Sequence, residues 1–83
     1  MLLNIYSLQK DVIRRDAKSV SVQTPNGEIT ILENHEPLIT PLTAHAIRVV
    51  DASGTEEHFE YAGGFIEVRP FPEKGGEVNI LAK

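Results

Sequence analysis

The chain has 83 residues, of which 41% are apolar and 24% are charged, and its formal net charge is −4. This length supports one domain, and the composition is that of a globular protein rather than a disordered one. The acidic balance argues against a nucleic-acid binder, which needs a basic face. No apolar run approaches the ~20 residues that span a bilayer. The sequence has no cysteine, so disulfides and thiolate metal sites are excluded.

Only residues 8–16 could form a helix. This segment is short, uncapped and followed by strands, so we interpret it as a short strand and turn. Beyond it, apolar and polar residues alternate with period two through residues 18–23, 29–31, 47–49, 58–61, 65–69 and 78–80. The apolar members are β-branched or aromatic, as half-buried strands prefer. In this reading Ile66 and Val68 face the core together with Ile80. The pattern predicts one all-β domain over residues 1–83, a two-sheet sandwich or flattened barrel.

Turn signals separate these strands. Asn26-Gly27, after Pro25, can take the positive φ values of a type I′ turn. Residues 51–54 separate the next adjacent pair of strands. Gly63-Gly64 predicts a bulge, a bend or the close approach of another backbone. The proline-rich segment 70–76 predicts a loop, because proline cannot donate to a sheet ladder.

Residues for catalysis or metal binding are sparse. The histidines are His35, His45 and His58, and none belongs to an HxxxH or HxxE pattern. His58 alternates with apolar residues and is predicted to face solvent. The sequence has no Gly-x-Ser-x-Gly motif and no phosphate loop. Glu56 and Glu57 are adjacent on a strand and should face opposite sides, so they cannot act as a catalytic pair. We therefore predict no catalytic residue, no metal site and no cofactor.

Four segments carry a family resemblance when they are taken in order. They are Gly-Glu-Ile-Thr-Ile-Leu at 27–32, His-Glu-Pro-Leu-Ile-Thr-Pro-Leu at 35–42, Gly-Gly-Phe-Ile-Glu-Val at 63–68 and Val-Asn-Ile-Leu-Ala at 78–82. Together they resemble the N-terminal domain of the epsilon subunit of the rotary F-type ATP synthase, over essentially the whole chain. The resemblance implies a two-sheet β-sandwich of about ten short strands. Where the family usually has Pro-Gly before the histidine, this chain has Asn34, which can adopt the left-handed conformation.

The resemblance also implies a function and its contact residues. The family domain lies in the central stalk beside the gamma subunit and rests on the ring of c subunits, where it helps to couple proton flow and rotation to ATP synthesis. The implied c-ring contact is Glu28 with Asn26 and Gly27, the implied gamma contact is His35, Pro37 and Leu38, and Gly63 and Gly64 are structural glycines. Two plainer interpretations remain open: Glu28 as a solvated turn residue, and Leu38 as a core residue in a structural turn.

Further expectations follow from the same resemblance and from the N-terminal residues, which lack the pattern of a secretory signal. The protein is expected to be non-catalytic, monomeric when isolated, and peripheral on the cytoplasmic face of the bacterial plasma membrane, without inserting into it. The family usually continues into a helical hairpin, which these 83 residues do not contain, so none of the hairpin's functions is expected of them.

Two other classes are weighed against this interpretation. A free-standing β-sandwich module for carbohydrate or peptide would display exposed aromatic residues. This chain has no Trp and five Phe or Tyr, most of them at core spacing, with Phe71 as the exception. A small enzyme is disfavoured by the missing site residues.

Overall fold

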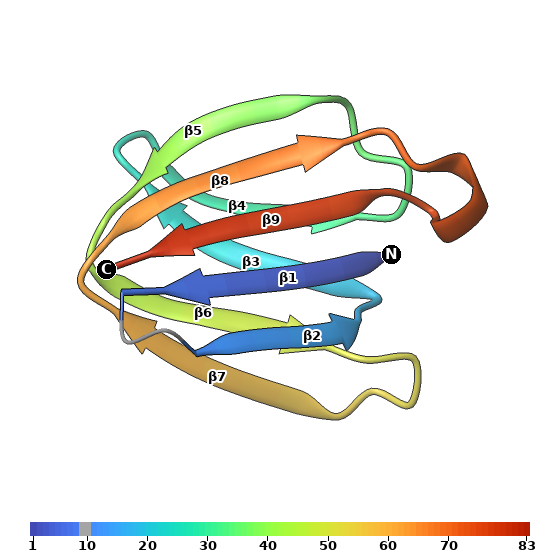
Figure 1. Ribbon diagram of the computed structural model, residues 1–83, viewed down its shortest axis with the longest axis horizontal. Coiled ribbons are helices and arrows are strands. Elements are labelled where there is room, and N and C mark those ends of the chain that lie inside the picture. The colour runs from blue at the N-terminus through green and yellow to red at the C-terminus, as the bar shows by residue number, and fades with distance from the viewer. Residues whose placement is uncertain (9–10) are drawn as a thin grey trace.

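The computed structural model describes residues 1–8 and 11–83, and within them it contains nine β-strands in two sheets (Figure 1). The strands are β1 (Leu2–Ser7), β2 (Val12–Asp16), β3 (Ser19–Thr24), β4 (Gly27–Leu32), β5 (Leu38–Leu42), β6 (His45–Val50), β7 (Glu56–Tyr61), β8 (Gly64–Arg69) and β9 (Glu77–Ala82), and a 3-10 helix, η1, spans Pro72–Lys74. The five-stranded sheet has the order β2-β1-β9-β8-β5, and the four-stranded sheet has the order β4-β3-β6-β7. The all-β two-sheet prediction is confirmed. The strand predicted within 8–16 is β2, whereas Gln9 and Lys10 lie outside the described residues.

The core fills the space between the two sheets. Its fully buried side chains are Leu3, Ile5, Val20, Val22, Ile31, Ile66, Val78 and Ile80. Ile66 pairs with Ile80 across β8 and β9, and Val68 pairs with Val78. The face predicted for β8 is therefore correct, because alternate residues of a strand point to the same side.

Two contacts link the two sheets. On one side β2 runs beside β7 (Figure 1), and Nε of Arg15 donates to Oε1 of Glu57 at 2.9 Å. The hydrogen bond that Arg15 donates to Glu57 and the charge of this carboxylate raise the pKa of Arg15 above its ordinary value. On the other side the backbone N–H of Thr43, just after β5, donates to the carbonyl oxygen of Gln23 on β3 at 3.1 Å. These two contacts therefore join the sheets on both sides of the sandwich.

The turn between β3 and β4 differs from the type I′ turn predicted at Asn26-Gly27. Thr24 pairs with Gly27, so Pro25 and Asn26 are the central residues. Proline fixes φ near −65°, which a type I′ turn cannot accept because it needs positive φ at both central positions. The positive φ falls instead on Gly27, at 112°. The hydroxyl of Thr24 donates to the carbonyl oxygen of Gly27 at 2.8 Å and fixes this turn.

The proline-rich segment folds as the predicted loop, with η1 inside it. It supports the β4–β5 connection, because the backbone N–H of Asn34 donates to the carbonyl oxygen of Gly75 at 2.7 Å. Asn34 has a φ of 61°, which confirms the left-handed conformation expected of this asparagine.

The loop between β6 and β7 is organised by one carboxylate. Oδ1 of Asp51 accepts hydrogen bonds from the backbone N–H groups of Ser53 at 2.9 Å and Thr55 at 3.0 Å, and from the Ser53 hydroxyl at 2.7 Å. The Ser53 hydroxyl bond, followed by the Thr55 backbone bond, lowers the pKa of Asp51 below its ordinary value. The ionised carboxylate therefore stabilises the folded loop.

This network predicts a pH-dependent stability. A carboxyl group whose pKa is lower in the folded state stabilises the fold above its unfolded pKa of about 3.9, and that stability is lost as the pH falls through the folded pKa. Asp51→Asn should therefore be less stable than the parent at neutral pH, and the two should converge in acid. Urea unfolding between about pH 7 and pH 2 measures this difference. Ser53→Ala, which removes the strongest donor, should give a smaller loss with the same pH trend. A difference between Asp51→Asn and the parent that is constant with pH would contradict this role of the carboxylate.

Candidate docking surfaces

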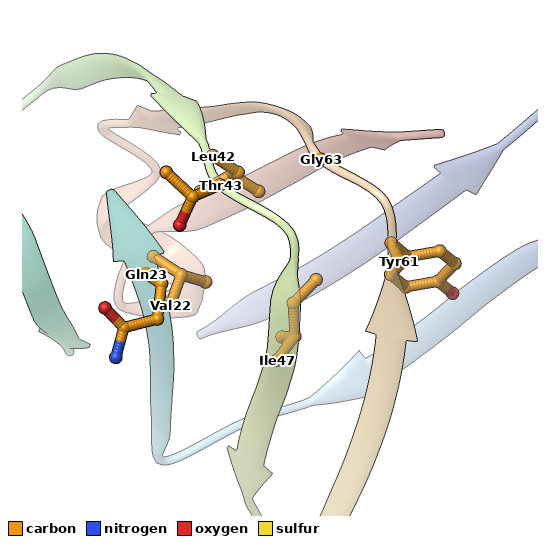
Figure 2. Close-up of a pocket in the computed structure, with 7 residues that line it drawn as sticks. All are labelled: Val22, Gln23, Leu42, Thr43, Ile47, Tyr61 and Gly63. Atoms are coloured by element: carbon orange, nitrogen blue, oxygen red, sulfur yellow. The ribbon is translucent and has the colours of Figure 1, made fainter. Parts of the chain in front are cut away.

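The interior of the sandwich offers little room for a ligand. A cavity of about 10 Å³ lies at the end where β3, β5 and β7 finish (Figure 2). Its lining residues are Val22, Gln23, Leu42, Thr43, Ile47, Tyr61 and Gly63. This volume corresponds to one water molecule at most. Across residues 1–8 and 11–83, no group of three or more His, Cys, Asp and Glu side chains is placed to hold a metal ion. Contact with other molecules therefore falls to the outer surface.

The two contact groups inferred from the sequence lie at opposite ends of the sandwich. The β3–β4 turn, with Asn26 and Gly27, is at the end where β9 finishes and the C-terminus lies (Figure 1). The β4–β5 connection, with His35 and Pro37, is at the other end, beside the loop that contains η1. The structure therefore keeps the two groups apart.

Glu28 belongs to β4 rather than to the tip of the turn, and its side chain is 51% exposed. Its Oε2 accepts a hydrogen bond from the amide of Gln23 at 3.3 Å, and its Oε1 lies 3.7 Å from Nη2 of Arg48. Arg48 also donates to the hydroxyl of Ser21 at 3.3 Å. The Glu28 carboxylate is therefore partly exposed to solvent and partly in contact with polar side chains on the outer face of the four-stranded sheet.

The other predicted contact group is partly structural. Leu38 is half-buried and packs against the core, so the core interpretation of this residue is correct in part. His35 is half-buried, and its Nδ1 lies 2.7 Å from the carbonyl oxygen of Glu36. Pro37 is exposed. Pro37 and Leu38 line a shallow groove with Ile39 and the end of β8, residues 67–70.

The remaining residues singled out in the sequence are two histidines and the glycine pair. His58 is exposed as predicted, 3.4 Å from Glu56, and the side chain of His45 is outside the described part of the structure. Gly64 begins β8, where a Cβ atom would lie 1.9 Å from the carbonyl oxygen of Leu81. Gly63 precedes it, and its carbonyl oxygen accepts from the N–H of Lys83 at 3.0 Å. Both glycines therefore lie against neighbouring backbone, one of the alternatives that the sequence offered.

A line of exposed apolar residues was missed by the sequence analysis. The pairing registers of all five strands of the larger sheet place one outward residue from each strand in a line: Val12, Tyr6, Leu81, Phe65 and Pro41. We call this line the apolar row. The exposed fractions are 52% for Val12, 36% for Tyr6, 59% for Leu81 and 52% for Phe65, and Pro41 is also exposed.

The sequence analysis placed most Phe and Tyr residues at core spacing, with Phe71 as the exception, and the structure shows that this expectation was wrong. Tyr6 and Phe65 are both exposed, whereas Phe71 is half-buried. On four of the five strands the neighbouring outward line is polar, with Arg14, Asn4, Asn79 and Glu67, and on β5 the exposed Ile39 follows Glu67. We call it the polar row. Nδ2 of Asn4 donates to Asn79 at 3.0 Å, and Nδ2 of Asn79 donates to Glu67 at 3.4 Å.

The outer face of the four-stranded sheet is different in character. Its middle line contains Thr30, Ser21, Arg48 and His58, matched by the β3–β4, β3–β6 and β6–β7 registers. The hydroxyls of Ser21 and Thr30 lie 2.9 Å apart. Contiguous exposed apolar surface marks interaction sites, so the five-stranded sheet presents the better docking face.

The fold and surface therefore define a small two-sheet β-sandwich with an exposed line of apolar side chains on one sheet. The family described as "ATP synthase, Delta/Epsilon chain, beta-sandwich domain" matches residues 1–83. The chain belongs to this family, which confirms the resemblance found in the sequence.

Similar proteins agree with this assignment. The chain is 40% identical to the ATP synthase epsilon chain of Halalkalibacterium halodurans over 98% of its own length, and 38% identical to that of Bacillus pumilus over the same share. It spans 56% and 57% of the lengths of these two relatives.

Solved structures share the fold. A chain of the Euglena gracilis mitochondrial ATP synthase, in a structure of its OSCP, F1 and c-ring parts, superposes with a TM-score of 0.83 at 23% identity, covering 96% of this chain and 48% of that one. A chain in the central stalk and c-ring structure of the Tetrahymena thermophila mitochondrial ATP synthase gives 0.71 at 14% identity, covering 98% and 63%. No helix in the described residues has the length and apolarity to cross a membrane.

Proposed function

We propose that this chain acts in the central stalk of an F-type ATP synthase, where it binds the gamma subunit and the c ring and couples proton flow and rotation to ATP synthesis. Family membership and the 40% identity to a bacterial epsilon chain support this proposal. The observation that carries it is the apolar row, an exposed line of side chains that a partner can bury. The domain would work without a catalytic site or cofactor of its own, at the cytoplasmic face of the plasma membrane.

The gamma subunit is the partner that we assign to the five-stranded sheet. The apolar row supplies hydrophobic area, and the groove beside Pro37 and Leu38 extends the same surface along β5. Interfaces of this kind are dominated by a few central aromatic or aliphatic anchors. Leu81 and Phe65 are the best placed, because β9 and β8 lie inside the sheet.

Assembly with gamma is the direct test. Co-expressed with the gamma subunit of the same organism, the chain should co-elute with it in gel filtration at micromolar concentration. The isolated chain at the same concentration should elute at the volume of a monomer. Two separate peaks for the co-expressed proteins would contradict the proposal.

The c ring is assigned to the opposite contact group, at the β3–β4 turn. Asn26 and Gly27 are exposed. About half of the Glu28 side chain is also exposed to solvent, although Arg48 lies beside its carboxylate. An acidic residue at this end suits a basic loop on the partner, since complementary charges guide association and fix its register.

Reversing this charge should weaken coupling without unfolding the domain. Glu28→Arg is expected to lower proton-driven ATP synthesis in membrane vesicles at low salt, because like charges across an interface repel. Salt should reduce the defect, since it screens exposed pairs. Stability should change by less than about 1 kcal/mol, the usual limit for an exposed ion pair. ATP synthesis rates across a salt series measure the effect.

Two control variants distinguish the contribution of the Glu28 charge from that of Arg48. Glu28→Gln removes the charge without reversing it, so it should couple better than Glu28→Arg. Arg48→Gln removes the internal partner at 3.7 Å and leaves the carboxylate, so coupling should remain near that of the parent. If Glu28→Arg synthesises ATP as fast as the parent at low salt, the c-ring contact lies elsewhere.

A free-standing binding module is the second candidate. Exposed Tyr6 and Phe65 are the observation in its favour, because aromatic faces can stack on sugar rings. Leu81 lies between them in the apolar row, however, so the two rings do not form a continuous platform. A protein partner fits the mixed aromatic and aliphatic line better.

A further inference from the structure

The apolar row has dimensions that restrict what can cover it. It crosses five strands at right angles to their direction, and neighbouring strands lie about 4.8 Å apart, so its length is about 19 Å. On β2, β1, β9 and β8 its width is one residue, because the adjacent outward line there is the polar row, whereas on β5 the exposed Ile39 widens it. A packed sheet needs several adjacent apolar lines, so this surface is too narrow for another sheet.

An α-helix laid across the strands matches these dimensions. Side chains at i and i+3 or i+4 on a helix lie about 5–6 Å apart, close to the spacing between the strands. A length of about 19 Å corresponds to about 13 helical residues at 1.5 Å per residue. An extended segment fits poorly, since its same-face side chains repeat at about 6.6 Å.

The charges of the polar row indicate in which direction a bound helix would run. Arg14, on β2, is exposed at one end of this row, and Glu67, on β8, is half-buried near the other. Glu67 accepts a hydrogen bond from Asn79 and lies 4.0 Å from Arg69. The N-terminal end of a helix carries partial positive charge and its C-terminal end partial negative charge. Because Arg69 offsets the charge of Glu67, the direction depends on Arg14, and the favourable orientation has the helix C-terminus toward Arg14 and its N-terminus toward β8.

We propose that the apolar row is a seat for one amphipathic α-helix of the gamma subunit, laid across the strands with its N-terminal end over β8 and its C-terminal end over β2. This inference rests on the proposed binding of gamma and adds the kind of element, its register and its direction. Each step from one strand to the next advances about three residues along the helix, as 4.8 Å divided by 1.5 Å requires.

Photo-crosslinking within the assembled complex tests this arrangement. A benzophenone amino acid replaces Phe65, Leu81 or Tyr6, one at a time, in the chain co-expressed with gamma. Irradiation and mass spectrometry then identify the captured gamma residues. The expected result is one gamma segment, with captured positions three or four residues apart and rising in number from Phe65 through Leu81 to Tyr6. The same amino acid at Leu32, on the outer face of the other sheet, should capture no gamma.

The possible outcomes distinguish failure of the proposed gamma binding from failure of the proposed helix. Loss of the complex with the unsubstituted chain overturns the proposed function and this inference with it. A complex whose three captured positions are one or two residues apart, or lie in unrelated segments, leaves gamma binding intact and overturns the helix. Captured positions that fall in number from Phe65 to Tyr6 overturn the direction.

The charge of Arg14 gives an independent measure of direction. In the favourable orientation Arg14→Glu should weaken gamma binding about 2–5-fold, the range expected for a charge at a helix terminus. The neutral control Arg14→Gln should lie between this variant and the parent, and added salt should bring all three together. Tighter binding by Arg14→Glu would overturn the proposed direction.

Discussion

Gly64→Ala should destabilise the domain by about 2–5 kcal/mol. The new Cβ atom would lie 1.9 Å from the carbonyl oxygen of Leu81 and 3.1 Å from Cα of Ala82, both backbone atoms of the paired strand. Relief requires β8 and β9 to separate, and overpacking of this kind costs about 1–3 kcal/mol or more. The φ of 139° adds strain that alanine cannot avoid. An 83-residue domain is expected to have only about 4–12 kcal/mol of stability, so this loss is large.

Gly54→Ala is the matched control for this change. Gly54 also has a positive φ, 88°, but no atom lies within 4 Å of the added Cβ. It should therefore cost only the conformational part, about 1–2 kcal/mol. Urea unfolding of both variants and the parent separates the two causes. Equal losses for Gly54→Ala and Gly64→Ala would show that the close approach of β9 is not what requires glycine at position 64.

Much of this fold was predictable from period-two alternation. In β8 the order of Phe65, Ile66, Glu67 and Val68 identifies the inward face, because side chains alternate across a strand. The turn at Pro25 shows the limit of local signals. Asn26-Gly27 is typical of a type I′ turn, but the proline before it moves the turn back by one residue.

The docking face was harder to predict because it depends on strand order. Tyr6 and Leu81 are neighbours only because β1 pairs in parallel with β9, across almost the whole length of the chain. Each residue of the apolar row looks ordinary within its own strand, as an apolar side chain on a face that is polar on most of the strands. The line appears only when four registers are known, and one sequence does not determine those registers.

Leu81→Asp should abolish most of the binding to gamma while the domain stays folded. Leu81 is central in the apolar row, on the central strand of its sheet, and is 59% exposed. A carboxylate there would be buried unpaired in the complex, and the loss of a central anchor costs about 2 kcal/mol or more. This corresponds to an affinity about 30-fold lower or worse. Titration calorimetry with purified gamma measures the change, and urea unfolding confirms that the fold persists.

Leu32→Asp provides a control of the same chemistry. Leu32 is 57% exposed, almost the same as Leu81, but it lies on β4, at the edge of the other sheet. Because both variants exchange a comparably exposed leucine for aspartate, they should have similar effects on solubility and stability. Only Leu81→Asp should lose affinity for gamma, since only Leu81 belongs to the apolar row. If Leu32→Asp weakens binding as much as Leu81→Asp does, gamma docks on the four-stranded sheet, and the assignment of the apolar row to gamma is wrong.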